Sequence, residues 1–285
     1  MVDRRFRLVD VFGSRPLAGN PLAVVVDTEG LTTDDMIEIT RWLGFSETTF
    51  LGPPESRDAD YSVRIFTLAG ELPFAGHPTL GSCHVWQTLA DESRDEVVQE
   101  CGAGLVRLRR QDDRYAFAAP PLIRSGPVDG DLLVNLASVL AIDPEDIVDS
   151  RWVDNGPGGV GLMLGDAGKV LSLRPQFSRR GNYDQLDIGV VGFHPKGSGT
   201  TYEVRAFFSD QHGDMVEDPV TGSLNASVAQ WMLETGRVSG PYVASQGTAI
   251  GRSGLIYVTP DDGEVWIGGR VFDVVSGLLA DLDQT

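Results

Sequence analysis

Apolar and polar residues alternate along most of the chain, in short runs separated by turns that contain glycine or proline. In the first half this period-two pattern predicts strands at residues 6–12, 22–26, 48–51 and 61–67. Between the second and third of these strands, Thr32 or Thr33 is expected to cap a helix that runs to about Leu43. The first half therefore combines short strands with at least one amphipathic helix.

Two longer segments depart from the alternation because they are apolar nearly all round. Residues 78–90 contain no charged side chain, and residues 219–233 repeat that pattern. A helix without a polar face has to be enclosed by protein. We expect one buried helix in each half of the chain.

The two halves also share sequence. Residues 61–66 read Tyr-Ser-Val-Arg-Ile-Phe and residues 202–207 read Tyr-Glu-Val-Arg-Ala-Phe; the same spacing pairs the Pro-x-x-Gly-Ser segments at 78–82 and 219–223. It also pairs His77 with Asp218. We expect a duplicated chain in which each half brings a polar residue to the start of a buried helix, with a site between the halves.

Proline and glycine at residues 120–130 are the one composition shift typical of a linker. We place the boundary there, giving an N-terminal half of residues 1–121 and a C-terminal half of residues 122–268. Further strands are expected at residues 104–110, 114–117, 254–259, 264–268 and 270–275, and a helix near 132–140. The tail, residues 269–285, is expected to pack back onto the first half. Many short strands around one central helix per half predict an α+β fold.

The composition limits the classes of partner that we expect the protein to bind. The formal net charge is −18, from 23 basic and 41 acidic residues, which disfavours binding to nucleic acid or to an anionic membrane surface. No stretch approaches the roughly 18 apolar residues of a membrane helix, and the N-terminus has no apolar leader, so a cytoplasmic location is expected. A small molecule remains the expected partner.

Three polar clusters could carry chemistry: residues 46–50, 76–78 and 217–223. Glu47 lies between two apolar segments, and a partly buried carboxyl group has a raised pKa that suits acid/base catalysis near neutral pH. The alternative is a structural glutamate bonded to nearby backbone N–H groups. For His77, Asp218 and Ser223 the alternative is a role as helix caps only.

Several other chemistries are disfavoured. A G-x-G-x-x-G match at residues 156–161 precedes a short strand instead of the helix that a dinucleotide site needs. Lys169 and Lys196 are the only lysines and lie outside the polar clusters, which disfavours pyridoxal phosphate. His77 and His84 have no third ligand at useful spacing, so no metal and no cofactor are expected.

Taken together, these segments resemble the PhzF family, the phenazine-biosynthesis-like isomerases that share the diaminopimelate epimerase fold. The resemblance covers nearly the whole chain, through residues 19–21, 46–50, 71–81, 217–223, 246–247 and 251–252. It implies two pseudo-symmetric halves, each an antiparallel sheet rolled around a central buried helix, with the active site in the cleft between them.

The resemblance also implies site residues. Glu47 would be the acid/base, with His77 and Asp218 as its polar catalytic partners. The substrate-binding residues would be Asn20, Ser46, Gly76, Thr79, Gly222 and Ser223. Relatives are commonly dimeric, so a homodimer is expected. Leu224 departs from the family at a position that is often small, which leaves the size and shape of the substrate open.

The predicted function is a cofactor-independent isomerase, in which one glutamate moves a proton on a small cyclic or unsaturated metabolite bearing amino and carboxyl groups. Racemases of this fold use one thiol from each half, but Cys83 and Cys101 are the only cysteines and the second half has none. Two alternatives stay open: a carbon–carbon bond hydrolase of a secondary-metabolite pathway, and a non-catalytic metabolite-binding relative.

Overall fold

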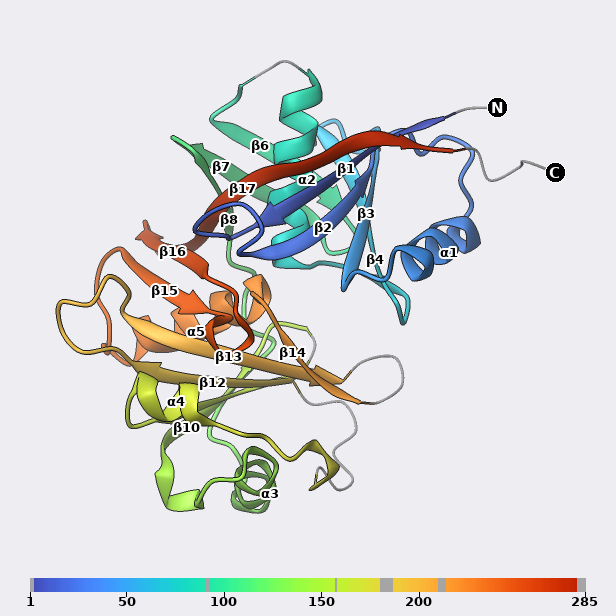
Figure 1. The fold of residues 1–285 in the computed structure, drawn as a ribbon. Coiled ribbons are helices and arrows are strands. Elements are labelled where there is room, and N and C mark those ends of the chain that lie inside the picture. Colours follow the sequence, from blue (N-terminus) through green and yellow to red (C-terminus); the bar gives the residue numbers. More distant parts are fainter. Residues whose placement is uncertain (1–2, 91–92, 157, 180–186, 210–213, 281–285) are drawn as a thin grey trace. The chain divides into compact units, whose positions relative to one another are not determined.

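The computed structural model describes residues 3–90, 93–156, 158–179, 187–209 and 214–280 (Figure 1). By its internal contacts the chain divides into two compact units: Met1–Ala118 with Gly268–Thr285, and Ala119–Ile267. We call these unit 1 and unit 2. The sequence placed the boundary between residues 121 and 122.

Unit 1 contains the strands and helices expected for the first half. Its elements are β1 (Arg4–Val11), β2 (Asn20–Val25), α1 (Thr33–Leu43), β3 (Glu47–Gly52), β4 (Tyr61–Thr67), β5 (Glu71–Leu72), α2 (Gly76–Ala90), β6 (Glu96–Cys101), β7 (Gly104–Gln111) and β8 (Arg114–Ala118). Thr32 caps α1: its hydroxyl accepts from the Asp35 N–H, and the Asp35 carboxylate accepts from the Thr32 N–H. This reciprocal capping box fixes where α1 begins.

The uncharged helix α2 is the centre of unit 1 and packs against β1, β2, β3, β4, β6 and β8. Together with β7 and β17 these strands form a closed sheet, because β7 joins β6 to β8 and β17 pairs with both β1 and β8. The approach of helix to sheet is close at Gly81, where an added Cβ would lie 2.5 Å from Leu22 Cδ2. The predicted enclosure of α2 is confirmed.

Unit 2 follows the second half of the sequence. Its elements are β9 (Arg124–Gly126), α3 (Gly130–Leu140), β10 (Ile147–Asp154), β11 (Gly159–Leu164), α4 (Ala167–Ser172), β12 (Asp187–Phe193), β13 (Tyr202–Ser209), β14 (Met215–Asp218), α5 (Gly222–Glu234), β15 (Tyr242–Gln246), β16 (Gly254–Asp261) and the start of β17 (Glu264–Leu279), with short 3-10 turns at Pro144–Asp146, Phe177–Arg179 and Thr248–Ile250. In α5, Trp231 packs on β11 so closely that a Cβ at Gly161 would lie 2.8 Å from its ring. The second uncharged helix is therefore also enclosed.

Three local expectations are wrong. The segment read as a linker contains β9, which pairs antiparallel with β10. The two last predicted strands form one strand, β17, which continues through Gly269 without a turn. Glycine is needed at this position for close packing, because an added Cβ would meet the Phe12 ring. The sheets are mixed in direction, because β2–β3, β4–β6, β11–β12 and β13–β15 are parallel pairs. Between the two strands of each parallel pair the chain includes a helix, which provides the crossover that parallel neighbours need.

The order of strand pairings recurs in the two units. In unit 1 an antiparallel pair β1–β2 is followed by parallel β2–β3, antiparallel β3–β4 and β4–β5, and parallel β4–β6 across α2. In unit 2 the same sequence of directions runs through β10–β11, β11–β12, β12–β13, β13–β14 and, across α5, β13–β15. The repeated segments at residues 61–66 and 202–207 form the corresponding strands β4 and β13.

Within the part of the chain described, every helix is too short or too polar to span a lipid bilayer.

Candidate functional site

Glu47 is the first residue of β3, where it pairs with Thr67 of β4 in the ladder. Its side chain is 16% exposed. This position agrees with the partial burial expected from the apolar segments on both sides. Next to it, Ser82 of α2 donates a hydrogen bond to Thr49 of β3 (2.9 Å), which ties the central helix to this strand.

His77 is the second residue of α2 and is only 4% exposed. Its Nε2 atom lies 3.4 Å from Glu47 Oε2, and its Nδ1 atom lies 3.3 Å from the Asn20 side-chain nitrogen. A charged imidazole would form an ion pair at the first distance. However, burial lowers the pKa of His77 to about 3, so the ring is neutral at ordinary pH.

The contact with Asn20 fixes which ring nitrogen carries the hydrogen. An amide NH₂ group only donates, so Nδ1 of the neutral ring must accept, and the hydrogen then lies on Nε2. The Nε2–H group is then on the side of the ring nearest Glu47, 3.4 Å from its Oε2 atom, in a contact that does not have hydrogen-bond geometry. Structure thus brings together three of the predicted site residues: Asn20, Glu47 and His77.

The other predicted residues of unit 1 differ in their accessibility. Gly76 begins α2, and helix geometry leaves the Gly76 and His77 N–H groups without partners inside the helix, while Pro78 has no N–H. Ser46 is half-buried and directly precedes Glu47. Thr79 is fully buried; its hydroxyl accepts from Gln99 (3.1 Å) and its N–H donates to a backbone oxygen of the preceding turn. These contacts favour a structural role for Thr79.

In unit 2, Asp218 is the last residue of β14 and does not open α5, which begins at Gly222. The equal spacing of His77 and Asp218 in the repeat therefore does not give them equal positions on their helices. The Asp218 carboxylate accepts from the Thr221 hydroxyl (2.5 Å), and the Asp218 carbonyl accepts from the Gln246 amide (3.1 Å). Asp218 is thereby held at the turn that leads into α5.

Gln246 organises this turn, a role that the sequence did not reveal. Its side chain is fully buried, and its oxygen accepts from the Thr221 N–H (3.1 Å) and the Asn225 amide (2.7 Å). The following residue must be glycine, because Gly247 has φ 91° and an added Cβ would lie 2.6 Å from the Pro219 carbonyl oxygen. The only signal in the sequence is that Gln246 and Gly247 form one of the segments that resemble the family.

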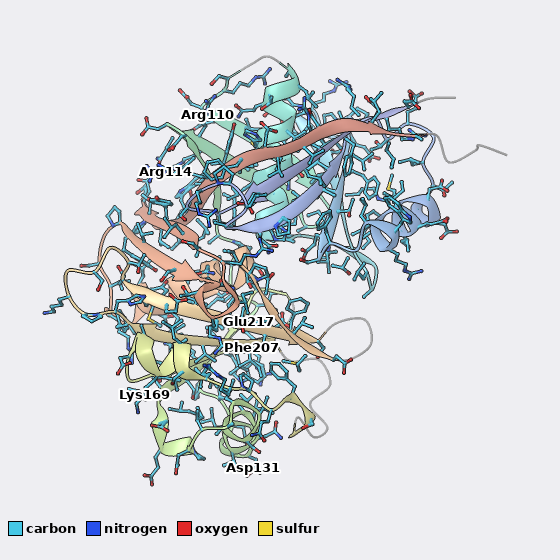
Figure 2. All side chains as sticks on the ribbon, in the orientation of Figure 1. Arg110, Arg114, Asp131, Lys169, Phe207 and Glu217 are labelled. Atoms are coloured by element: carbon cyan, nitrogen blue, oxygen red, sulfur yellow. The ribbon has the colours of Figure 1, made fainter. Side chains whose placement is uncertain are left out.

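A buried ion pair fixes the strand that carries Asp218. Arg205 of β13 binds Glu217 of β14 with two hydrogen bonds (2.9 and 2.6 Å) and donates two more to the carbonyls of Val170 and Leu173. Glu217 lies opposite Phe207 in the ladder, and both are labelled in Figure 2. Glu217 therefore has a structural partner, although it belongs to one of the polar clusters singled out above.

The start of α5 offers backbone donors. Thr221 is its N-cap residue but makes no side-chain capping bond, so helix geometry leaves the first N–H groups, from Gly222 onward, without intrahelical partners. The Ser223 carbonyl accepts from the Asn155 amide (2.9 Å), which fixes the first turn. Such a terminus can bind an anionic group.

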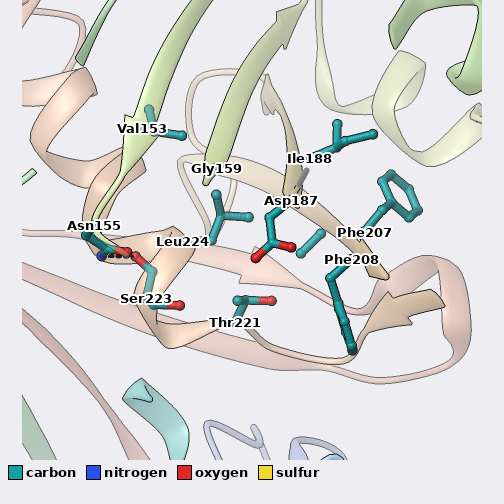
Figure 3. A pocket seen from close by; sticks show the side chains of 11 residues that line it. Val153, Asn155, Gly159, Asp187, Ile188, Phe207, Phe208, Thr221, Ser223 and Leu224 are labelled. Atoms are coloured by element: carbon teal, nitrogen blue, oxygen red, sulfur yellow. Dashed lines mark hydrogen bonds between the residues drawn. The ribbon is translucent and has the colours of Figure 1, made fainter. Parts of the chain in front are cut away.

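A small pocket of about 30 Å³ opens beside this helix start, with room for one or two waters or a compact polar group (Figure 3). Ser223 and Leu224 line it, together with Asp187, the first residue of β12. Burial and the nearby carboxylates of Asp218 and Asp154 raise the pKa of Asp187 to about 7. Asp187 lies outside the three polar clusters of the sequence, where its only signal is an acidic residue directly before an apolar strand.

Neither cysteine is placed for two-thiol chemistry. Both belong to unit 1, and Cys83 is fully buried in α2, where burial raises its pKa to about 12. Among the residues that the structure describes, no group of three or more histidine, cysteine, aspartate or glutamate side chains could hold a metal ion.

Comparison with known proteins decides the family. Residues 9–276 match the family described as phenazine biosynthesis-like protein, PhzC-PhzF. The chain belongs to this family. It is 31% identical over 297 residues to antisense-enhancing sequence 1 of Schizosaccharomyces pombe, covering 97% of this chain and 99% of the relative. It is also 31% identical over 256 residues to trans-2,3-dihydro-3-hydroxyanthranilate isomerase of Pseudomonas fluorescens, covering 88% of each chain.

Solved structures agree with this assignment and with the α+β fold. A predicted epimerase from Pseudomonas aeruginosa superposes with a TM-score of 0.77 at 27% identity, over 98% of this chain and 99% of that one. A hydroxyproline epimerase from Agrobacterium vitis superposes with a TM-score of 0.59 at 12% identity, over 99% of this chain and 93% of that one, which shows likeness of fold alone. The epimerase-like fold expected from the resemblance is confirmed, and the protein is a PhzF-family isomerase.

Proposed function

We propose that this PhzF-family protein is a cofactor-independent isomerase in which Glu47 removes a proton from one carbon of a small cyclic amino-carboxylate and returns it to another. The observation that carries the proposal is the contact of Glu47 with a neutral His77 whose Nδ1 is engaged by Asn20. This contact places a neutral ring beside the proposed base and adds no second charge there.

The proposed step needs no outside reagent. A C–H bond breaks, its proton goes to the Glu47 carboxylate, and the electron pair enters the conjugated system of the substrate. The double bonds shift, and Glu47 returns the proton to a different carbon of that system. Substrate and product are isomers, so no oxidant or reductant is consumed.

In this proposal the substrate-binding residues of unit 2 serve the same substrate. The N–H groups at Gly222 and Ser223 bind its carboxylate, Asp218 acts as a polar catalytic partner, and an acidic side chain of unit 2 binds its amino group. The relative from Pseudomonas fluorescens is named for trans-2,3-dihydro-3-hydroxyanthranilate, a cyclic compound with an amine and a carboxylate. We propose that compound, or a close analogue, as the substrate class. We also propose that the protein is a homodimer, which the molar mass of the purified protein from light scattering would test.

Mass spectrometry of the reaction with that compound tests the function. An isomerase leaves the mass unchanged in ordinary water, and in heavy water the product gains deuterium at a carbon, because the Glu47 carboxyl exchanges with solvent. A product heavier by one water or split into two fragments would show a hydrolase instead. No conversion of this compound or its analogues, together with reversible binding, would show a non-catalytic relative.

A further inference from the structure

Among the residues that the structure describes, one ionisable side chain lines the pocket beside the start of α5. Among its lining residues, Asn155, Thr221 and Ser223 are polar and neutral, Leu224 and Phe208 are apolar, and Asp187 alone carries a titratable group. Figure 3 shows the Asp187 carboxyl group in the middle of these side chains, directed towards Leu224 and Thr221. The pocket therefore takes its charge from Asp187.

Among the described residues, the charged groups that act on Asp187 are both negative. They are Asp218, at the end of β14, and Asp154, at the end of β10. Both have hydrogen-bond donors of their own: the Thr221 hydroxyl binds Asp218, and the N–H groups of Gly156 and Gly158 bind Asp154 (2.8 and 2.9 Å). Burial and this repulsion raise the pKa of Asp187 to about 7. A cationic group in the pocket would offset both effects, because an opposite charge favours the ionised form of the carboxyl group.

We propose that Asp187 determines specificity by binding a primary ammonium group of the substrate inside this pocket, next to Ser223. The proposal rests on the proposed function, because it refines which substrate that site accepts. An ammonium ion suits the pocket since it is compact, carries several donors and pairs with a carboxylate by charge-assisted hydrogen bonds.

The neighbouring features select the rest of the ligand. The Ser223 side of the pocket adjoins the uncapped N–H groups of α5, which suit a carboxylate on the same molecule. Leu224 lines the pocket, and its side chain also packs closely on Gly189, where an added Cβ would lie 2.7 Å away. The larger residue at this position therefore restricts the pocket to a compact head group. Asp187, Ser223 and Leu224 together select a small ring with adjacent ammonium and carboxylate groups.

Binding of two matched, unreactive ligands tests the proposal. Isothermal titration calorimetry compares beta-aminocyclohexanecarboxylate with cyclohexanecarboxylate, which lacks only the ammonium group. The wild type should prefer the amino ligand by about 10-fold to 10²-fold, as expected for one charge-assisted pair. Asp187→Asn should abolish this preference and leave the affinity for cyclohexanecarboxylate unchanged or higher. Asp262→Asn, which removes an exposed charge from a turn of unit 2, should keep it.

Asp187→Glu supplies a second variant with the charge retained, so it should keep most of the preference even if the asparagine variant folds poorly. The same titrations with Glu47→Gln separate this inference from the proposed function, because binding needs no proton transfer. Full turnover in Glu47→Gln would contradict the proposed function and leave the binding result readable. A preference that survives in Asp187→Asn, or no preference in the wild type, would overturn the role of Asp187.

Discussion

Asp187 should make the folded protein less stable as the pH rises. Its pKa is about 7 in the folded state against 3.8 for an ordinary aspartate, so between these values the folded state holds a proton that the unfolded state has released. Stability present below pH 3.8 is therefore lost progressively and is fully lost above about pH 7. Asp187→Asn cannot ionise and should escape this loss.

The magnitude follows from the size of the shift. Each pKa unit corresponds to about 1.4 kcal/mol, so a shift of roughly three units sets an upper bound of about 4 kcal/mol. Because Asp187 is only half-buried and solvent screens part of the repulsion, we expect a gain of about 1–2 kcal/mol for Asp187→Asn at about pH 8, and almost none at about pH 4. A carboxylate retained at such a cost to stability is typical of a functional site.

Urea unfolding of wild type, Asp187→Asn and Asp262→Asn at both pH values measures this difference. The control corrects for the general relief of charge repulsion in a chain of net charge −18. The reasoning is refuted if Asp187→Asn is no more stable than the control at the higher pH. It is equally refuted if the gain is the same at both pH values.

Three further predictions follow from the contacts described. His77→Leu should lower kcat about 10-fold to 10²-fold with little change in KM, because it removes the neutral N–H group nearest the proposed base; circular dichroism checks the fold. Gly161→Ala should destabilise the protein by about 1–3 kcal/mol by pushing on Trp231, whereas Gly165→Ala, where an added Cβ meets Lys169 only at 3.7 Å, should not; equal midpoints of denaturation would contradict this. Cys83 should resist thiol reagents in the folded protein, and a quantitative reaction of both thiols without unfolding would disprove its burial.

Much of the fold could be predicted because its signals are local. The capping box at Thr32 and Asp35 fixes the start of α1, and the absence of charge in α2 predicts its enclosure. The repeat, by contrast, misled where it was followed residue by residue. Pro78 lies inside the first turn of α2, whereas Pro219 lies before α5, so Asp218 closes a strand where His77 belongs to a helix.

The parts of the site that the sequence missed depend on contacts between distant segments. Gln246 of β15 accepts hydrogen bonds from Thr221 and Asn225 at the start of α5, and the residues next to Gln246 in the sequence give no indication of these contacts. The pKa of Asp187 depends on burial and on carboxylates from β10 and β14, which only the fold brings near. The pairing of His77 with Asn20 is non-local in the same way, although both residues belonged to the motifs that indicated the family.

The most direct test of the proposed mechanism is the turnover number of Glu47→Gln with the proposed substrate. Glutamine keeps the size of the side chain but cannot accept and return a proton, so kcat should fall by at least about 10²-fold while the unfolding transition stays that of the wild type. Glu38→Gln, which changes an exposed glutamate of α1 in the same unit, should retain full activity. A Glu47→Gln enzyme that turns over within a few-fold of the wild type would contradict the central claim that this carboxylate carries the proton.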